Sequence, residues 1–333
     1  MTSPSLNRRN ACLTLGALLS GGLTAGAPVA ADEFPSKPIT LIVPFSPGNT
    51  SDLWARMVAP KLSALWRQPV IVENKPGAST MIGVDFVRRS KPDGHTLLLG
   101  SLSTSMAKLT NANVQFDPQA ELAPVCKYLS FKIVIATNAV TYAKAKTLPD
   151  LVALSKSTPD GIFFGGTGPG TALNMSAAFP LNGLGMRYSE VNYNGMPPVI
   201  LALIRNEVQL LTNTPAALKS HIDNGSIYPI AALGNERFSD LPNVQTVREA
   251  GYKGFYPVLW NALFAPKNTP QLVLDRIARD VAAVTAAPDM KDRIESGFSG
   301  FIPTSNPQSF ARELEAETKQ WRNYLASINF KPQ

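Results

Sequence analysis

The sequence predicts an α/β fold of two lobes, each a doubly wound sheet with flanking helices. Strands and helices alternate from residue 39 to residue 100, and the same alternation restarts at Lys132. A late apolar strand, Trp260–Pro266, is followed only by helices. A chain of 333 residues has room for about two domains of 100 to 200 residues. We therefore expect residues 32–132 and 258–333 to form a first lobe and residues 133–257 a second lobe.

The first part of the chain alternates buried strands with amphipathic helices. Ile39–Phe45 is a nearly continuous apolar run, as expected of a parallel strand that is buried on both faces. Thr50, Ser51 and Asp52 offer N-cap oxygens to a helix whose apolar residues recur at helical spacing. The same reasoning predicts strands at 69–73 and 96–100 and a helix at 82–89.

The second part of the chain repeats this alternation. It predicts strands at 132–137, 161–165, 208–211 and 227–233 and helices at 148–157, 171–179, 270–286 and 307–326. Two similar lobes imply a cleft between them, and small ligands bind in clefts that face the carboxyl ends of strands. We expect the lobes to close about the crossings near residues 133 and 257.

Composition excludes several classes of protein. With 44% hydrophobic and 17% charged residues, the chain can bury a core, which excludes a disordered tail, collagen and a disulfide-stapled miniprotein. The net charge of +7 comes from 31 basic and 24 acidic residues. The basic residues are scattered and no basic run is longer than Arg88–Arg89. We therefore expect no nucleic-acid partner, which would need a clustered patch.

The N-terminus has the features of a secretory signal. Arg8 and Arg9 precede the apolar run Ala11–Leu23, which is shorter than the about 20 residues that span a bilayer. Small residues follow, so we expect a signal peptide at residues 1–31 that is cleaved after Ala31, and a periplasmic location. The arginine pair hints at twin-arginine export, but the following residues do not complete that motif, and the export route stays open.

Catalytic and metal chemistry have few candidate residues. Beyond the predicted signal, Cys126 is the only cysteine, and we expect it to be a small buried hydrophobe in a strand. His95 and His221 lack metal-ligand spacing, which favours surface or capping roles. Asp52 could be a catalytic carboxylate, but capping is the ordinary role of such a residue at a helix start. With no nucleophile motif such as G-x-S-x-G, the sequence predicts no enzyme, no metal and no cofactor.

Two loops that open helices are the most informative segments. Pro47–Asp52 and Gly165–Thr171 place backbone N–H groups and hydroxyls at helix N-termini, where the helix macrodipole contributes about half a positive charge. Two such loops facing one cleft would suit a ligand with two carboxylates. Each loop could equally be a tight turn before a capped helix, because glycine is the default turn residue.

A nucleotide site is an alternative reading of the second loop. Gly166, Gly168 and Gly170 resemble a dinucleotide fingerprint, and Glu190 lies 20 residues beyond Gly170. The third glycine of that motif would fall at Thr171, and the proline between Gly168 and Gly170 removes a backbone donor. The sequence therefore disfavours a nucleotide.

Six segments, in order along the chain, carry a resemblance to a known family. They are Phe34–Ile39, Val43–Asp52, Val72–Ala78, Pro92–Gly100, Val247–Gly251 and Leu263–Pro266. Together they resemble the Bug-type substrate receptors of tripartite tricarboxylate transporters. The match covers essentially the whole chain beyond the predicted signal.

The resemblance implies a two-domain periplasmic binding protein of the Venus-flytrap, type II-like kind. Such a receptor closes on a small carboxylate and delivers it to a membrane permease. In that family, loop amides, hydroxyls and waters hold the ligand's carboxylates. Carried over by position, and with two aromatic residues that could line the cleft, the ligand-binding candidates are Phe45, Gly48, Asn49, Thr50, Ser51, Asp52, Ser103, Thr104, Gly168, Pro169, Gly170, Thr171, Tyr193 and Asn213.

The sequence departs from the family pattern at several positions. A usual Gly-Gly pair is Gly48–Asn49 here, and another is Ser79–Thr80. The basic residue often found after the cleft tyrosine is Asn194, and a common aspartate of the second-lobe loop is Asn213. Loss of that carboxylate argues against a ligand with an ammonium group. We expect a dicarboxylate, aromatic and of the phthalate type if the aromatic candidates line the cleft.

Three functions remain open on the sequence. The first is a non-enzymatic periplasmic receptor that serves a tripartite tricarboxylate-type permease, and it is the one we favour. The second is a ligand sensor that docks on a membrane signalling protein through the same closing cleft. The third is a secreted enzyme, which the scarcity of histidine disfavours. A delivery receptor is usually monomeric, so we expect a monomer.

Overall fold

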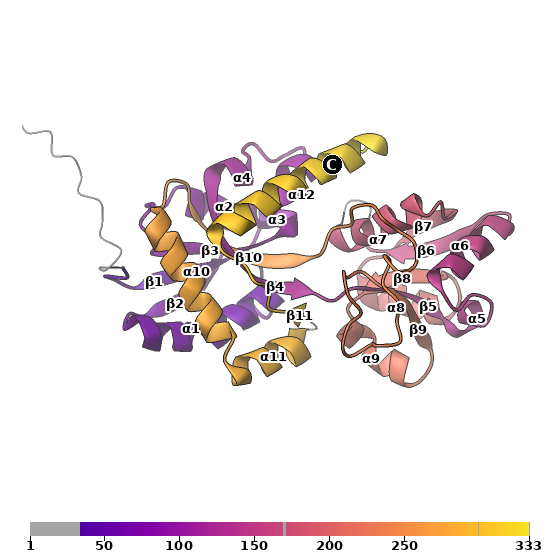
Figure 1. Cartoon of the computed structure of the whole chain (residues 1–333). Coiled ribbons are helices and arrows are strands. Elements are labelled where there is room, and N and C mark those ends of the chain that lie inside the picture. Colours follow the sequence, from indigo (N-terminus) through magenta and orange to yellow (C-terminus); the bar gives the residue numbers. More distant parts are fainter. Residues whose placement is uncertain (1–33, 169–170, 299, 333) are drawn as a thin grey trace, which may run out of the picture. The chain divides into compact units, whose positions relative to one another are not determined.

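The computed structural model describes residues 34–168, 171–298 and 300–332. Residues 35–333 form one compact unit, which is described here by itself. Figure 1 labels its helices and strands in chain order. The predicted signal peptide and its cleavage site lie outside the described residues. Among the described residues, no helix combines the length and apolar composition that crossing a membrane requires.

The first sheet has six strands in the order β11-β4-β10-β3-β1-β2. Its strands are β1 Ile39–Val43, β2 Val70–Asn74, β3 Thr96–Ser101, β4 Leu122–Phe131, β10 Trp260–Pro266 and β11 Gly300–Phe301. Strand β1 pairs in parallel with β2 and β3, so the carboxyl ends of these three strands meet at one edge. Strand β10 comes from much later in the sequence and lies antiparallel between β3 and β4.

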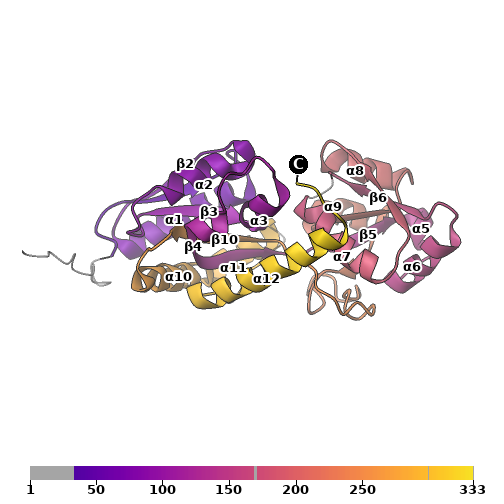
Figure 2. The same ribbon diagram turned by 90° about the horizontal axis from the view of Figure 1, so that it is seen from above.

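Helices cover both faces of this sheet. Figure 2 shows α2 and α3 on one side and α10 and α12 on the other. The helical segments are α1 Thr50–Trp66, the 3₁₀ turn η2 Ala78–Thr80, α2 Met81–Arg88, α3 Leu102–Thr110, α4 Pro118–Glu121, α10 Gln271–Thr285, α11 Pro288–Phe298 and α12 Pro307–Ser327. Helix α1 shows why these segments pack, because Trp54, Val58 and Leu62 recur every fourth residue and are all buried.

The second sheet has five strands in the order β7-β6-β8-β5-β9. Its strands are β5 Val134–Asn138, β6 Ile162–Gly166, β7 Tyr188–Asn192, β8 Leu210–Asn213 and β9 Ile227–Ala232. The helices along it are α5 Ala139–Tyr142, α6 Leu148–Ser157, α7 Ala172–Gly183, α8 Met196–Ile204 and α9 Pro215–Asp223. Strands β7, β6 and β8 are parallel neighbours, so their carboxyl ends also share one edge.

The α/β fold with two sheets and flanking helices is confirmed. Cys126 is confirmed as a buried residue of β4. The cap of α1 differs from the prediction, because Asn49 is the N-cap and Thr50 to Asp52 belong to the first turn. The helix expected at His221 is α9, whereas strands β7 and β11 and helices α3, α4, α5, α8 and α11 were not predicted. The lobe boundaries at residues 132, 133, 257 and 258 stay a prediction.

Candidate functional site

The loop between β1 and α1 is organised by its own side chains. Gly48 has a φ of 84°, a left-handed conformation that glycine adopts without strain. Asn49 Oδ1 accepts a hydrogen bond from the Ser51 amide at 2.8 Å, as an N-cap residue does. Gly48 and Asn49 are exposed, and Thr50 is half-buried. This part of the loop is therefore accessible to a ligand.

Asp52 fixes the loop from beneath. Its carboxylate is 2% exposed and accepts hydrogen bonds from the Gly48 amide at 2.9 Å, Arg56 Nε at 3.0 Å and Asn74 Nδ2 at 2.9 Å. Burial acts to raise the pKa of Asp52, but these donors outweigh it and hold the pKa below its ordinary value. The carboxylate therefore has a structural role, although the N-cap of α1 is Asn49 and not Asp52.

Ser51 lies behind the loop in a buried polar network. Its side chain is 1% exposed, and Ser51 Oγ accepts from the Tyr128 hydroxyl and from Asn261 Nδ2, each at 3.2 Å. Tyr128 belongs to β4 and Asn261 to β10. Trp54 stacks on Tyr128 with ring centroids 3.8 Å apart. The Ser51 hydroxyl therefore ties the first turn of α1 to two strands of the sheet.

The loop after β2 connects the first loop to helix α3. Asn74 Nδ2 donates to the Phe45 carbonyl at 3.2 Å as well as to Asp52. At the other end of this loop, the Thr80 and Thr104 hydroxyls lie 3.4 Å apart. Thr104 is 1% exposed, whereas its neighbour Ser103 is exposed. The edge of the first sheet thus brings together Phe45, Gly48 to Asp52, Ser103 and Thr104.

Residues 78–80 have an unusual backbone. Ala78, Ser79 and Thr80 have φ values of 45°, 51° and 79°, which side-chain-bearing residues seldom adopt. The sequence has Ser79–Thr80 where related receptors are expected to have glycines. The structure has a left-handed turn here without glycine, and strained backbone of this kind is commonly found at functional sites.

The second sheet gathers a matching group of candidates at the carboxyl ends of β6, β7 and β8. The Tyr193 amide donates to the Gly166 carbonyl at 2.9 Å, and Tyr193 is half-buried. Thr171, the N-cap of α7, donates from Oγ1 to the Gly168 carbonyl at 3.0 Å. The predicted residues Pro169 and Gly170 lie outside the described residues.

Asn213 and Asn174 flank the second loop. Asn213 is 8% exposed and its Oδ1 accepts from the Thr214 amide at 2.8 Å, before α9 begins. Asn174 is 2% exposed and its Oδ1 accepts from the Thr167 amide at 3.2 Å. The Thr212 hydroxyl donates to the Leu173 carbonyl at 3.0 Å, which ties β8 to the first turn of α7.

The two histidines do not join either group. Of the surface or capping role expected for His95, the surface alternative is wrong, because His95 is 8% exposed. Its Nε2 accepts from the Ser36 amide at 3.3 Å and its Nδ1 lies 3.2 Å from Asp93, so it organises a turn. His221 lies on α9 near the Ser226 hydroxyl. No three His, Cys, Asp or Glu side chains within the described ranges are grouped to hold a metal ion.

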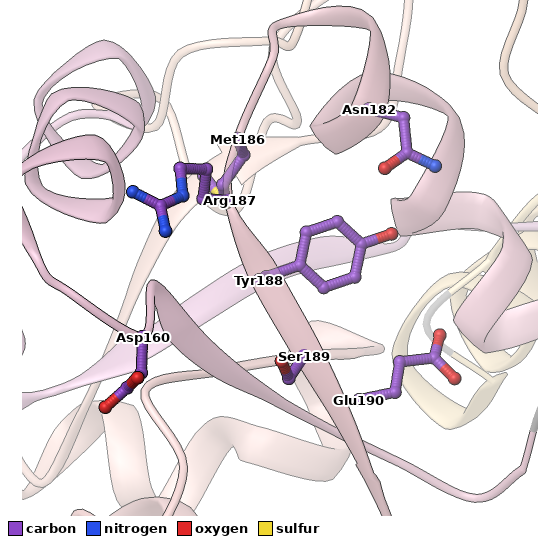
Figure 3. Close-up of a pocket in the computed structure, with 7 residues that line it drawn as sticks. All are labelled: Asp160, Asn182, Met186, Arg187, Tyr188, Ser189 and Glu190. Atoms are coloured by element: carbon purple, nitrogen blue, oxygen red, sulfur yellow. The ribbon is translucent and has the colours of Figure 1, made fainter.

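A separate pocket of about 540 Å³ lies along β7. It is lined by Asp160, Asn182, Met186, Arg187, Tyr188, Ser189 and Glu190. Figure 3 shows Tyr188 and Glu190 on one side of the strand and the Arg187 guanidinium on the other. Burial raises the pKa of Glu190 above its ordinary value. Glu190 thus lines this pocket, and an interaction with the Asn174 side chain partly offsets the effect of burial.

Comparison with known proteins identifies the family. A model described as "Tripartite tricarboxylate transporter family receptor" matches residues 54–330. The chain belongs to this receptor family. The protein BugT of Bordetella pertussis (strain Tohama I / ATCC BAA-589 / NCTC 13251) is 33% identical over 263 residues, which are 78% of this chain and 80% of BugT.

Solved structures share the fold of this receptor. A TctC solute-binding protein from Polaromonas, without ligand, has a TM-score of 0.79 at 21% identity and covers 88% of this chain and 99% of its own. The periplasmic binding protein BugD has a TM-score of 0.68 at 26% identity, with coverages of 90% and 100%. These proteins are described as receptors or binding proteins, not as enzymes.

Two further structures of the same fold contain carboxylates. A protein from R. palustris solved with adipate has a TM-score of 0.71 at 24% identity and covers 90% of this chain and 100% of its own. MatC from Rhodopseudomonas palustris with bound malate has a TM-score of 0.66 at 23% identity, with coverages of 87% and 99%.

Sequence reasoning missed the residues that support the loops. Asn74, Tyr128 and Asn261 hold Asp52 and Ser51 in place, yet none was a candidate. The sequence did offer one sign of the role of Asn74. It is a polar residue at the last position of an apolar strand, and the carboxyl ends of such strands form the edge of the sheet where ligands bind. Tyr128 and Asn261 gave no local signal, since their role depends on strand pairing between distant segments.

Proposed function

We propose that this receptor captures a small organic dicarboxylate in the periplasm and delivers it to a tripartite tricarboxylate-type permease. One carboxylate would bind at the loop of Gly48 to Thr50 and Ser103, and the other at the loop of Gly168 to Thr171 with Tyr193. The two loops would face each other across a cleft and close on the ligand. The export signal and cleavage after Ala31 are part of the same proposal.

The observation that supports it most is the kind of donor that each loop offers. Both loops open helices of more than two turns and present amides and hydroxyls, which suit an anion. Arg56 is the cation bonded beneath the first loop, and its charge is engaged by Asp52. Neutral donors at two places favour two carboxylates that are bound by hydrogen bonds without a buried ion pair. The adipate and malate bound by proteins of the same fold are dicarboxylates and agree with this class.

A thermal-shift screen of residues 32–333 tests the substrate class. Aliphatic, aromatic and amino dicarboxylates, tricarboxylates and nucleotides would be compared at equal concentration. A ligand present at 100 times its Kd adds about 2.7 kcal/mol of stability, which shifts the Tm by several degrees. We expect shifts with dicarboxylates that lack an ammonium group. Shifts with nucleotides alone would refute the proposal.

Delivery to a permease needs a separate measurement. Uptake of the radiolabelled ligand by intact cells would be compared between wild type and a deletion strain, with complementation by the wild-type chain. Loss of uptake on deletion is the expected result. Normal uptake with loss of a transcriptional response to the ligand would instead indicate a signalling receptor.

A further inference from the structure

A groove on helix α12 is lined by basic side chains that have no role in the proposed carboxylate site. Its volume is about 600 Å³. It is lined by Gln119, Pro124, Ala311, Arg312, Leu314, Glu315, Ala316, Thr318, Lys319 and Arg322. The groove lies between α12, α4 and the start of β4, and Figure 2 shows that α12 lies at the surface of its sheet.

Three cations of this groove are unpaired among the described residues. Arg312, Lys319 and Arg322 are exposed, and no described carboxylate lies within salt-bridge distance of any of them. They are spaced at i, i+7 and i+10, so they lie on one side of the helix. Glu315 is the acidic residue of the lining. The groove therefore carries an excess of two positive charges that the protein itself leaves unneutralised.

The length of the basic stripe limits what can bind it. Arg322 lies ten positions after Arg312, which corresponds to about 15 Å along a helix. An extended peptide of about four or five residues spans the same length. A small dicarboxylate would contact one or two of the cations and leave the others unpaired. An extended acidic segment can pair with all three.

The floor of the groove is held in place before anything binds. The Thr318 hydroxyl lies 2.9 Å from Gln119 Oε1 and 2.6 Å from the Leu314 carbonyl. Gln119 Nε2 donates to the Ser105 carbonyl of α3 at 3.1 Å. Leu314 is 5% exposed, so the floor is packed as well as hydrogen-bonded. A partner that docks here would therefore lose little binding free energy to the ordering of receptor side chains.

We propose that the α12 groove binds an extended acidic segment of a protein partner. The membrane permease of the proposed function is the natural partner, so that part of the inference rests on the proposed function. A concave groove that also offers Pro124, Ala311 and Ala316 suits a peptide chain with small apolar residues between its acids. A flat anionic lipid surface would meet the rim and leave the floor unused.

The test uses a fluorescein-labelled heptapeptide of alternating Asp and Ala, with fluorescence anisotropy as the readout. We expect saturable binding that is lost at about 0.5 M salt, because surface charge pairs are screened within a few ångströms there. The triple variant Arg312→Gln, Lys319→Gln, Arg322→Gln should weaken binding about tenfold, since each exposed ion pair contributes modestly. The matched control is Lys91→Gln, Lys144→Gln, Lys253→Gln, which removes three exposed unpaired cations elsewhere and should leave binding within about twofold.

Several results would overturn the inference. Absence of peptide binding, or equal losses in the groove variant and the control, would mean that only general charge attraction acts. Groove-dependent binding to phosphatidylglycerol vesicles without peptide binding would assign the groove to a membrane surface instead. Carboxylate thermal shifts are measured on the same variants and should not change, so failure of the groove and failure of the proposed carboxylate site are distinguishable.

Discussion

Each candidate loop leads from a strand into a helix, but the contacts that the structure describes at the two loops differ in kind. The β1–α1 loop is held by buried side chains, since Asp52 and Asn74 bond its backbone and Ser51 anchors its helix to the sheet. The β6–α7 loop is held by short-range contacts, in which Thr171 and Asn174 bond carbonyl and amide groups only a few residues away. A loop built on buried polar contacts depends on distant residues, whereas a locally closed loop depends on its own sequence.

The largest effect should come from Asp52→Ala. It removes a buried carboxylate with three donors, leaves the Gly48 amide without that acceptor and leaves Asn74 Nδ2 bonded to the Phe45 carbonyl alone. We expect a loss of about 3 kcal/mol in the free energy of unfolding, measured by urea denaturation, and weaker carboxylate binding. Asp150→Ala is the control, because Asp150 also bonds a helix start but is exposed on α6. It should cost about 1 kcal/mol and leave affinity unchanged. Equal effects of the two variants would contradict the special role of the first loop.

The second prediction compares the loops directly by hydroxyl removal. Thr171→Ala should weaken ligand binding by about 1 to 3 kcal/mol, the scale of a hydrogen bond to a charged group, as measured by titration calorimetry. Ser51→Ala should weaken binding less, because the buried Ser51 hydroxyl positions the first loop and does not reach the ligand. Only Ser51→Ala should also lower the unfolding free energy, because two buried donors lose their acceptor. Thr147→Ala, at the cap of α6, controls for hydroxyl loss. Unchanged affinity in both loop variants would refute the site assignment.

The carboxylates of Glu317 and Asp52 should make the stability of the fold depend on pH in opposite directions. Glu317 on α12 accepts from Trp260 Nε1 at 2.9 Å, and burial raises its pKa to about 7. The folded state therefore holds a proton that the unfolded chain releases near its ordinary pKa of 4.5. The stability contribution of Glu317 is complete below pH 4.5 and is lost as the pH rises through about 7. Asp52 has the opposite sign, because its lowered pKa stabilises the fold above its unfolded pKa and this is lost as the pH falls.

Glu317→Gln isolates that effect, because the amide oxygen can still accept from Trp260. The Tm of the variant should exceed that of wild type at pH 8 and equal it at pH 4, with thermal melts across this range as the measurement. Glu315→Gln, an exposed carboxylate of the same helix, serves as the control. If Glu317→Gln changed the Tm by the same amount at every pH, burial would not be what raises the pKa of Glu317.

The smallest expected effect concerns ligand charge in the second loop. Asn213→Asp places a carboxylate at a position that is 8% exposed. We expect affinity for a dicarboxylate to fall about fivefold, as one like charge in a partly solvated site would cause, and affinity for an amino dicarboxylate to rise. Asn213→Ala separates charge from lost hydrogen bonds. Calorimetry that finds equal affinities for the Asp and Ala variants would place Asn213 away from the ligand.

Local sequence patterns were sufficient for the parts of the fold that depend on neighbours in sequence. The buried runs of β1 and β10 and the helical period of α6 and α12 gave elements within two residues of those observed. Strand β7 was missed because Tyr188–Asn192 lies at an edge and is only partly buried, so its apolar signal is weak. Both loops could be located from their glycines and hydroxyls. The Tyr128–Ser51–Asn261 network could not, because it exists only once β4 and β10 pair.

That network also gives the receptor an optical property. Trp54 lies 0% exposed against Tyr128, three residues from Ser51, and the chain has four tryptophans in all. We expect a carboxylate that binds at the first loop to change the electric field at the Trp54 indole ring without contacting the ring. Tryptophan emission should therefore follow ligand arrival in the unlabelled protein, and Trp54→Phe should silence that signal while the other three tryptophans continue to emit.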